Sequence, residues 1–133
     1  MIACTEIPLF FRPRLVVAEG NSAQAALLCR QFRRLGWEVH LASSGPDARR
    51  LARLLEPQLV ILDTALREES GWLTCAKLTL ENEELEVILL DESATECQRQ
   101  FAQFVGASAL VTRDGGVPAL VAEVHEAAGA QQD

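Results

Sequence analysis

Five short apolar runs alternate along the chain with segments of helical periodicity. The apolar runs cover residues 15–18, 37–42, 59–62, 87–90 and 109–112, and the helical segments that follow them cover 22–35, 46–55, 72–80, 95–105 and 117–128. The runs are largely apolar at consecutive positions, which is typical of strands buried on both faces of a sheet. Strands that alternate with helices over short connections predict an α/β fold with one parallel sheet between two layers of helices.

The length of the chain suits one domain. The sequence has 133 residues, of which 49% are hydrophobic and 23% charged, a composition typical of a soluble globular protein. Residues 1–13 contain Pro8 and Pro13 and are expected to form an extended lead-in, whose Leu9, Phe10 and Phe11 pack on the domain or meet a partner. We expect the single domain to cover residues 14–128 and a frayed tail to cover 129–133.

Charge and apolar content restrict the classes of partner. The net charge of −7 argues against general affinity for nucleic acid or for an anionic membrane surface, because both need clustered Lys and Arg. No apolar run reaches the roughly 18 residues of a membrane span, and no basic stretch followed by an apolar one opens the chain, so a cytoplasmic location is expected. The four cysteines are scattered without metal-ligand spacing, so we expect small core residues in a reducing compartment. They are Cys4, Cys29, Cys75 and Cys97.

Charged side chains follow four of the five predicted strands. Asp63 comes directly after the run 59–62, Glu19 follows the first strand, Asp91 the fourth and Arg113 follows Thr112 of the fifth. The carboxyl ends of parallel strands meet at one edge of the sheet, where open α/β sheets carry their binding sites. We therefore expect these side chains to converge on one rim.

The residues and their spacing resemble the receiver domains of two-component response regulators over nearly the whole chain. Glu19 matches an acid after the first strand, Asp63 the phosphoaccepting aspartate, and Gly71 a glycine eight residues further on. The segment 106–113 matches the approach to the lysine of the family. The resemblance implies a flavodoxin-like fold of five βα units with strand order 2-1-3-4-5, and a signalling module rather than an enzyme.

The chain departs from the pattern of the family where the chemistry is done. Gly20 stands in place of the second acid, Asp91 in place of Ser or Thr, Arg113 in place of Lys, and Asp114 in place of Pro. Leu110 occupies the position of the aromatic switch residue. Such a chain resembles a degenerate, or pseudo-receiver, member of the family.

Gly20 bears on the metal that the resemblance implies. Receivers hold Mg²⁺, which takes oxygen ligands, and the matching groups here are the carboxylates of Glu19 and Asp63 and the backbone carbonyl of Ala65. Gly20 removes one negative charge from this set, which lowers the attraction for a divalent cation. Binding of Mg²⁺ is therefore predicted to be weak or absent.

The two phosphate-site positions, Asp91 and Arg113, have opposite charges. An ionised Asp91 can only accept hydrogen bonds and would repel a phosphoaspartate. Arg113 carries a planar fork that suits carboxylates. We expect Arg113 to pair permanently with Asp63, Asp91 or both; the alternative is an arginine that points to solvent.

Three functions remain open at this stage. The first is a stand-alone signalling module of a two-component or phosphorelay system, with a degenerate site at Asp63, that acts through protein–protein interaction. The second is a working phosphoacceptor that a histidine kinase phosphorylates at Asp63. The third is a small flavodoxin-like hydrolase or ligand-binding protein, although the second aspartate that a phosphate hydrolase wants two residues after its nucleophile is Ala65, and His40 and His125 stand alone.

A protein is the expected partner. The resemblance implies a histidine kinase or a downstream signalling protein, bound through the face formed by the fourth helix, the fifth strand and the fifth helix. A homodimer stays open, and neither nucleic acid nor a membrane is expected to bind directly.

Overall fold

The computed structural model describes residues 12–114 and 116–131 and contains five strands and five helices in strict alternation. Residues 1–11 of the expected lead-in lie outside the described residues. The strands are β1 (Arg14–Ala18), β2 (Glu38–Ala42), β3 (Leu59–Asp63), β4 (Glu86–Asp91) and β5 (Ala109–Thr112). The helices are α1 (Ser22–Arg34), α2 (Gly45–Leu55), α3 (Gly71–Glu81), α4 (Glu96–Phe104) and α5 (Gly116–Gln131).

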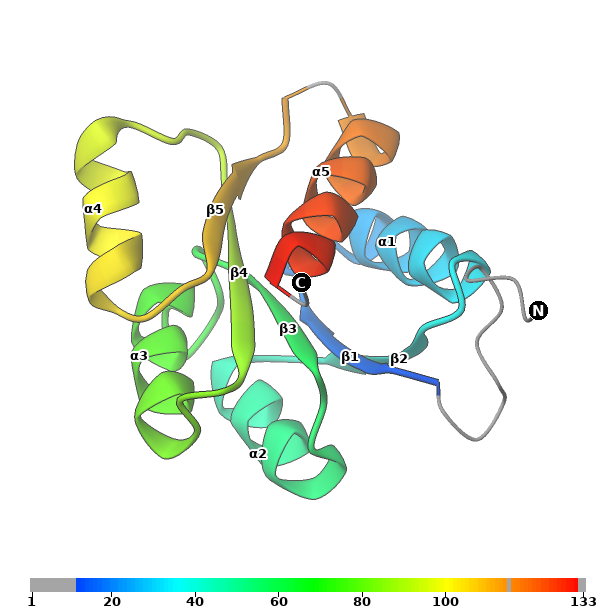
Figure 1. The fold of residues 1–133 in the computed structure, drawn as a ribbon, viewed down its shortest axis with the longest axis horizontal. Coiled ribbons are helices and arrows are strands. Elements are labelled where there is room, and N and C mark those ends of the chain that lie inside the picture. Colours follow the sequence, from blue (N-terminus) through cyan, green and yellow to red (C-terminus); the bar gives the residue numbers. More distant parts are fainter. Residues whose placement is uncertain (1–11, 115, 132–133) are drawn as a thin grey trace.

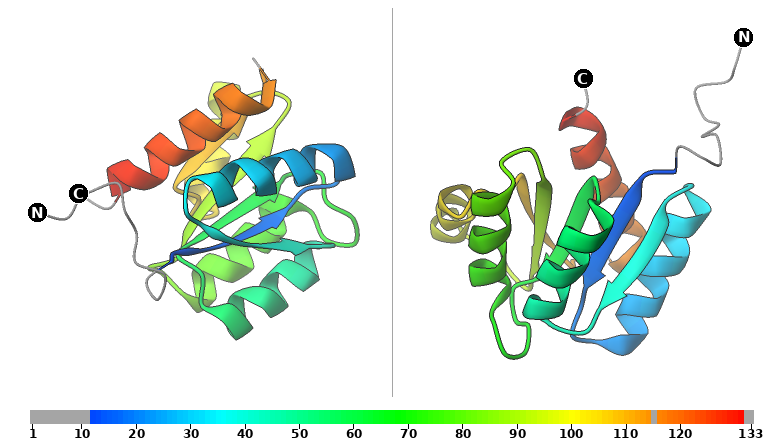
Figure 2. Two further views of the ribbon diagram at one scale, coloured as in Figure 1. Left: turned by 90° about the vertical axis from the view of Figure 1, so that its right-hand side faces the viewer. Right: turned by 90° about the horizontal axis from the view of Figure 1, so that it is seen from below.

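The strands form one parallel sheet in the order β2-β1-β3-β4-β5, as predicted. Helices α1 and α5 cover one face, and α2, α3 and α4 cover the other (Figure 1). The three layers are seen edge-on in Figure 2. Sequence alternation and sheet topology therefore agree on a flavodoxin-like fold.

Alternate residues of each strand feed two separate cores. Leu15 and Val17 of β1 pack with Leu28 and Phe32 of α1 on one face of the sheet. Val16, also in β1, packs with residues of α2, α3 and α4 on the other. Because successive strand residues point to opposite faces, a sheet covered on both sides needs apolar residues at consecutive positions.

Capping residues set the ends of the helices. Thr95 is the N-cap of α4 rather than its first residue, and it forms a capping box with Gln98. Val105 is the C-cap of the same helix, so α4 is shorter at both ends than predicted. In contrast, α5 continues to Gln131, beyond the predicted end at Ala128. Ala130 and Gln131 in this extension are good helix formers, whereas Gly129 is a poor one, so helix propensity alone does not account for the longer helix.

Most of the apolar side chains of α4 are exposed rather than buried in the core. Phe101 is 45% exposed, Phe104 is 84% exposed, and Cys97 lies on the surface. The helix packs through Ala102 and its cap Val105 instead. Cys29 and Cys75 are core residues as expected, whereas the expectation for Cys97 is wrong, and Cys4 lies outside the described residues.

Gly71 lets the loop after β3 return to the strand end. Its amide donates to the backbone carbonyl of Thr64 at 2.9 Å. A Cβ atom at position 71 would lie 2.1 Å from the backbone oxygen of Asp63, far closer than atoms can approach. The packing of this loop therefore requires the glycine eight residues after Asp63.

Among the described residues, no helix has the length and apolarity needed to cross a membrane.

Candidate functional site

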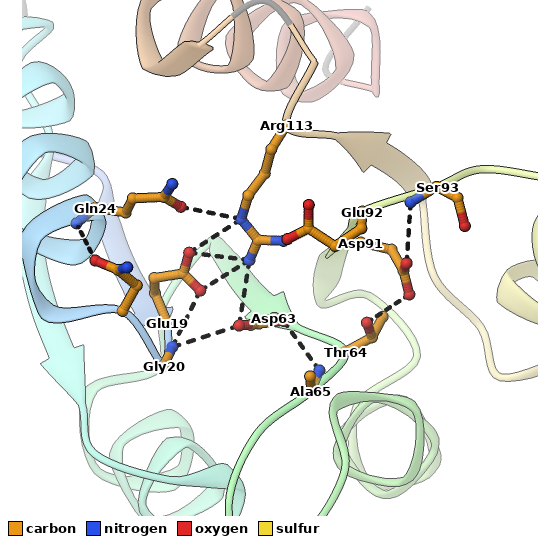
Figure 3. Close-up of polar contacts among 11 residues, drawn as sticks. Glu19, Gly20, Gln24, Asp63, Thr64, Ala65, Asp91, Glu92, Ser93 and Arg113 are labelled. Carbon is orange, nitrogen blue, oxygen red and sulfur yellow. Dashed lines mark hydrogen bonds and ion pairs between the residues drawn. The ribbon is translucent and has the colours of Figure 1, made fainter.

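The carboxyl ends of four strands bring the predicted side chains to one rim of the sheet. Glu19 follows β1, Asp63 ends β3, Asp91 ends β4 and Arg113 follows β5. Figure 3 shows these residues around the guanidinium of Arg113. The expected convergence on one rim is present.

Arg113 grips Glu19 with both arms of its fork. Its Nη2 lies 2.8 Å from Glu19 Oε2 and 2.9 Å from Oε1, and its Nε lies 3.1 Å from Oε1. The same Nη2 lies 3.2 Å from Asp63 Oδ2. The side chains of Glu19, Arg113 and Asp63 are only 1%, 12% and 13% exposed, so this cluster is largely shielded from water.

Two further side chains complete the surroundings of the guanidinium. Gln24 of α1 accepts from Arg113 Nε at 3.1 Å, and the exposed Glu92 accepts from Nη1 at 3.3 Å. Arg113 thus bridges groups at the carboxyl ends of β1, β3 and β4, and its orientation is fixed from several sides.

Of the two expected partners of Arg113, the structure shows Asp63 and not Asp91. Asp91 accepts a hydrogen bond from the Thr64 hydroxyl at 2.6 Å and another from the Ser93 amide at 3.1 Å. These two donors hold the carboxylate of Asp91, and Arg113 reaches past it toward Glu19 (Figure 3).

The role of Glu19 as the main partner of Arg113 was missed from the sequence. Strands β1 and β3 are neighbours, with Ala18 opposite Leu62, so the residues that follow them stand side by side. The predicted strand order contained this signal, because Glu19 and Asp63 are the next residues along the two strands. Thr64 and Glu92 directly follow β3 and β4 and share this strand-end signal, whereas Gln24 lies within α1 and had none.

Asp63 is held by its own loop as well as by Arg113. Its Oδ1 accepts from the Ala65 amide at 2.9 Å and its Oδ2 from the Gly20 amide at 3.4 Å. Burial acts to raise the pKa of Asp63, but the hydrogen bonds from Glu19 and Ala65 and the charge of Arg113 together bring it below its usual value. Asp63 is therefore the ionised member of the carboxyl pair.

Glu19 has the opposite shift. Burial and the neighbouring Asp63 raise its pKa to about 7, and the attraction of Arg113 opposes this rise without cancelling it. One positive charge between two buried carboxyls cannot fully compensate two negative charges, so one proton is retained until near neutral pH.

The site does not fit a magnesium ion. Arg113 already engages both oxygens of Glu19 and one oxygen of Asp63. No group of three or more His, Cys, Asp or Glu side chains in residues 12–114 and 116–131 could hold a metal. A bound cation would place a positive charge next to the two carboxylates. Here the guanidinium of Arg113 supplies that charge instead.

Gly20 has space for a larger residue. A Cβ atom there would lie 3.6 Å from Asp63 Oδ2 and 3.8 Å from the backbone oxygen of Ala65, which are ordinary contact distances. Gly20 is also not among the residues with a positive φ. Neither packing nor backbone conformation requires glycine at position 20.

Leu110 is buried in the core under α4 and is only 6% exposed. It also lines a hollow of about 330 Å³ between α4, β5 and α5, together with Arg99, Gln103 and Glu123. The aliphatic side chain of Leu110 packs from β5 into the core between the sheet and the helices α2, α3 and α4.

A second buried ionic cluster lies behind the loop that follows Asp63. Glu69 accepts from Arg49 Nε and Nη2 at 3.1 Å each, from Lys77 at 2.7 Å and from the Thr74 hydroxyl at 2.6 Å. Burial acts to raise the pKa of Glu69, but hydrogen bonds from Arg49, Lys77 and Thr74 bring it down to about 2. Sequence reasoning missed this cluster. Thr74 and Lys77 lie only 5 and 8 residues after Glu69, but Arg49 lies 20 residues before it on another helix.

Residues 15–125 match the family model described as the response regulator receiver domain. The chain belongs to the receiver-domain family. As a receiver, it is 31% identical over 114 residues to the phosphate regulon transcriptional regulatory protein PhoB of Rhizobium meliloti, a match that covers 84% of this chain and 50% of that protein. The receiver thus spans about half the length of this relative.

Solved structures show the same receiver fold. The signal receiver domain of a Luxo repressor protein from Vibrio parahaemolyticus superposes with a TM-score of 0.80 at 20% identity, over 91% of this chain and 93% of that one. A CheY-like receiver from Methanospirillum hungatei has a TM-score of 0.81 at 16% identity, over 91% and 97%. At these sequence identities, the similarities show a shared fold.

Proposed function

We propose that this receiver is a signalling module that acts through protein–protein interaction, with a degenerate phosphorylation site. One observation carries the proposal: Arg113 bridges Glu19 and Asp63 in a largely buried cluster. The ion pair takes the place of a reversible contact to a phosphoryl group, and the module is held in one state.

Three features of the site support this proposal. Asp63 Oδ2, an oxygen that would attack a phosphodonor, is engaged by Arg113 and by the Gly20 amide. Gly20 supplies no carboxylate for a metal that would neutralise the incoming phosphoryl group. Asp91 offers no hydroxyl to a phosphoryl oxygen.

A working phosphoacceptor is the second candidate. It is favoured by the two hydrogen bonds that the Asp91 carboxylate accepts from Thr64 and Ser93. Because these donors partly offset the negative charge, Asp91 repels a phosphoryl group on Asp63 less than an aspartate without such partners would. Arg113 would then stabilise the phosphoryl oxygens. The hydrolase or ligand-binding alternative gains no support from the rim, where position 65 is alanine.

The partner surface that we propose is the face of α4, β5 and α5. The hollow between these elements is lined by side chains that can donate and accept hydrogen bonds, among them Arg99 and Gln103. Phe101 and Phe104 are also exposed on α4, but Phe101 contacts Trp72 of α3 at a ring-centroid distance of 5.0 Å and stacks on Phe104, so these two rings lie on the α3 side of the helix and outside this face. The partner would be a histidine kinase, a downstream signalling protein or a second copy of the receiver.

A phosphorylation assay separates the two candidates. The receiver is incubated with Mg²⁺ and acetyl phosphate, and its intact mass is measured beside that of Asp63→Asn. We expect no phosphoryl adduct on the wild type, because Arg113 occupies Glu19 and Asp63.

The matched positive control restores the residue types of the family in the triple variant Gly20→Asp, Asp91→Thr, Arg113→Lys. We expect this variant to form an adduct that disappears when Asp63 is also changed to Asn. A stoichiometric, Asp63-dependent adduct on the wild type would instead establish the second candidate.

A further inference from the structure

Three arginines on α1 lack acidic partners. Arg30, Arg33 and Arg34 form no ion pair with any residue of the described chain, although the sequence contains 19 acidic residues. Arg33 donates instead to the backbone oxygen of Val39 at 3.1 Å, which fixes its side chain against β2. The three residues concentrate positive charge locally on a protein whose net charge is −7.

The same arginines border a groove between α1 and β2. The groove has a volume of about 630 Å³ and is lined by Ala26, Cys29, Leu41 and the three arginines. Leu41 lies opposite Val17, which belongs to the core under α1, so Leu41 is on the covered face of the sheet. It is nevertheless 51% exposed, because α1 does not extend over it.

The groove opens onto the edge of the sheet. β2 is the terminal strand in the order of the described sheet, at the end where α1 packs (Figure 1). The Glu38 amide donates to Pro13 on the side of β1, and backbone groups alternate in direction along a strand, so those of Val39 and Leu41 point away from the sheet. Arg33 occupies the oxygen of Val39, which leaves the backbone groups of Leu41 directed toward the open edge.

We propose that the α1–β2 groove binds an extended acidic segment of a partner protein. Carboxylates of the segment would pair with Arg30 and Arg34, an apolar side chain would cover Leu41, and its backbone could hydrogen-bond to the edge of β2. The apolar floor favours a protein segment over nucleic acid or lipid headgroups. The net negative charge of the receiver would also repel a long polyanion such as nucleic acid. A short acidic segment interacts mainly with the nearby arginines.

This surface goes beyond the proposed function, because it lies at the opposite end of the sheet from the α4–β5–α5 face. The two surfaces could be engaged together. The test needs no phosphodonor, so its outcome is independent of phosphorylation at Asp63.

The test uses a short synthetic peptide that alternates Glu and Val, titrated into the isotope-labelled receiver and followed by amide chemical shifts. We expect shifts confined to α1 and β2 and an affinity that falls as salt is raised. The double variant Arg30→Glu, Arg34→Glu should bind about tenfold or more weakly. The matched control is Arg50→Glu, Arg67→Glu, which makes the same charge change at exposed positions outside both the groove and the α4–β5–α5 face and should bind like the wild type.

Three outcomes would overturn the proposal. The first is no shift in α1 and β2 with the Glu-Val peptide. The second is equal binding of a peptide that alternates Lys and Val. The third is equally tight, Arg30- and Arg34-dependent binding of polyphosphate or duplex DNA, which would indicate a general anion site rather than a site for an acidic protein segment.

Discussion

Arg113 holds together two buried carboxyl groups that would repel each other in its absence. Its fork engages both oxygens of Glu19 and still reaches Asp63 through the same Nη2 atom. A lysine has a single ammonium group and could not donate from two nitrogens to the Glu19 carboxylate in this way. An arginine at this position therefore has a geometric consequence beyond the positive charge that it shares with lysine.

The raised pKa of Glu19 predicts an unusual pH dependence of stability. Its pKa of about 7 in the folded chain lies above its ordinary value of 4.5, so the folded state retains a proton that the unfolded state releases. The stabilisation from this group is complete below pH 4.5 and is lost as the pH rises through 7. Between these values the free energy of unfolding should fall by at most about 1.4 kcal/mol per pH unit because of Glu19.

Urea denaturation at a series of pH values measures this slope. Glu19→Gln should lack the decrease between acidic and neutral pH. Glu92→Gln is the matched control, because Glu92 also contacts Arg113 but its side chain is 85% exposed. An unchanged slope in Glu19→Gln would show that Glu19 does not hold the proton.

The space beside Gly20 predicts that an aspartate at this position would allow the site to bind Mg²⁺. An aspartate there would stand beside Asp63 Oδ2 and the Ala65 carbonyl, which lie 3.6 and 3.8 Å from its Cβ position. In the variant Gly20→Asp, Arg113→Lys, these oxygens would be available to Mg²⁺. Mg²⁺ should raise the melting temperature of this variant and leave that of the wild type unchanged.

Two single variants act as controls for this gain. Gly20→Ala adds the Cβ atom without the charge and should behave like the wild type, while Gly20→Asp alone should bind Mg²⁺ more weakly than the double variant because Arg113 still engages Glu19 and Asp63. A wild-type protein stabilised by Mg²⁺ as much as the double variant would contradict the assignment of Arg113 as the resident cation.

At the scale of secondary-structure elements, hydrogen bonds join the ends of β3 and β4 to the start of α4. Thr64, which follows β3, donates to Asp91 at 2.6 Å, and Asp91 accepts from the Ser93 amide at 3.1 Å. Ser93 Oγ in turn donates to Gln98 Oε1 at 2.9 Å, and Gln98 belongs to the capping box of α4. The position of α4 is thus tied to the rim through fixed contacts.

Thr64→Val tests this link. The valine keeps the shape of the buried Thr64 but leaves Asp91 Oδ2 without its donor, so we expect a loss of about 1–3 kcal/mol in the free energy of unfolding. Amide hydrogen exchange in the first turn of α4 should also become faster. The control is Thr112→Val, because the Thr112 hydroxyl makes no hydrogen bond to the described residues. Unchanged exchange in α4 would mean that its anchoring does not depend on Thr64.

At the scale of the whole molecule, the Glu69 cluster connects α2, α3 and the loop from β3. Arg49 comes from α2, Lys77 and Thr74 come from α3, and all three bind one carboxylate whose side chain is 7% exposed. A buried charge of this kind is stable only while its partners are present. The cluster therefore fixes the loop that follows Asp63 to the helix layer beneath it.

The lowered pKa of Glu69 predicts loss of stability in acid. Its pKa of about 2 lies below its ordinary value of 4.5, so the stabilisation is present above pH 4.5 and is lost as the pH falls through 2. Glu69→Gln should be less stable than the wild type at neutral pH and should show a shallower acid transition. Glu83→Gln, which removes an exposed carboxylate that forms no ion pair with the described residues, should leave that transition nearly unchanged. Equal acid transitions in Glu69→Gln and the wild type would contradict the assignment.

Periodicity in the sequence predicted the elements and their order because it depends on neighbours along the chain. Consecutive apolar residues indicated strands covered on both sides, and the strand ends indicated where Glu19, Asp63, Asp91 and Arg113 would gather. Helix ends were predicted less well, because a cap residue looks like part of the helix in the sequence. Thr95 caps α4 by its side chain and Val105 caps it by its backbone amide.

The sequence by itself determined the fold, the rim and the charged residues on it, since strand and helix periods are local properties. Only the tertiary structure decided that Arg113 takes Glu19 rather than Asp91, that Phe101 and Phe104 face outward, and that Leu41 is left uncovered beside three arginines. Each of these depends on the direction of a side chain relative to an element distant in sequence. Such directions are set by packing between elements, which no spacing along a single chain records.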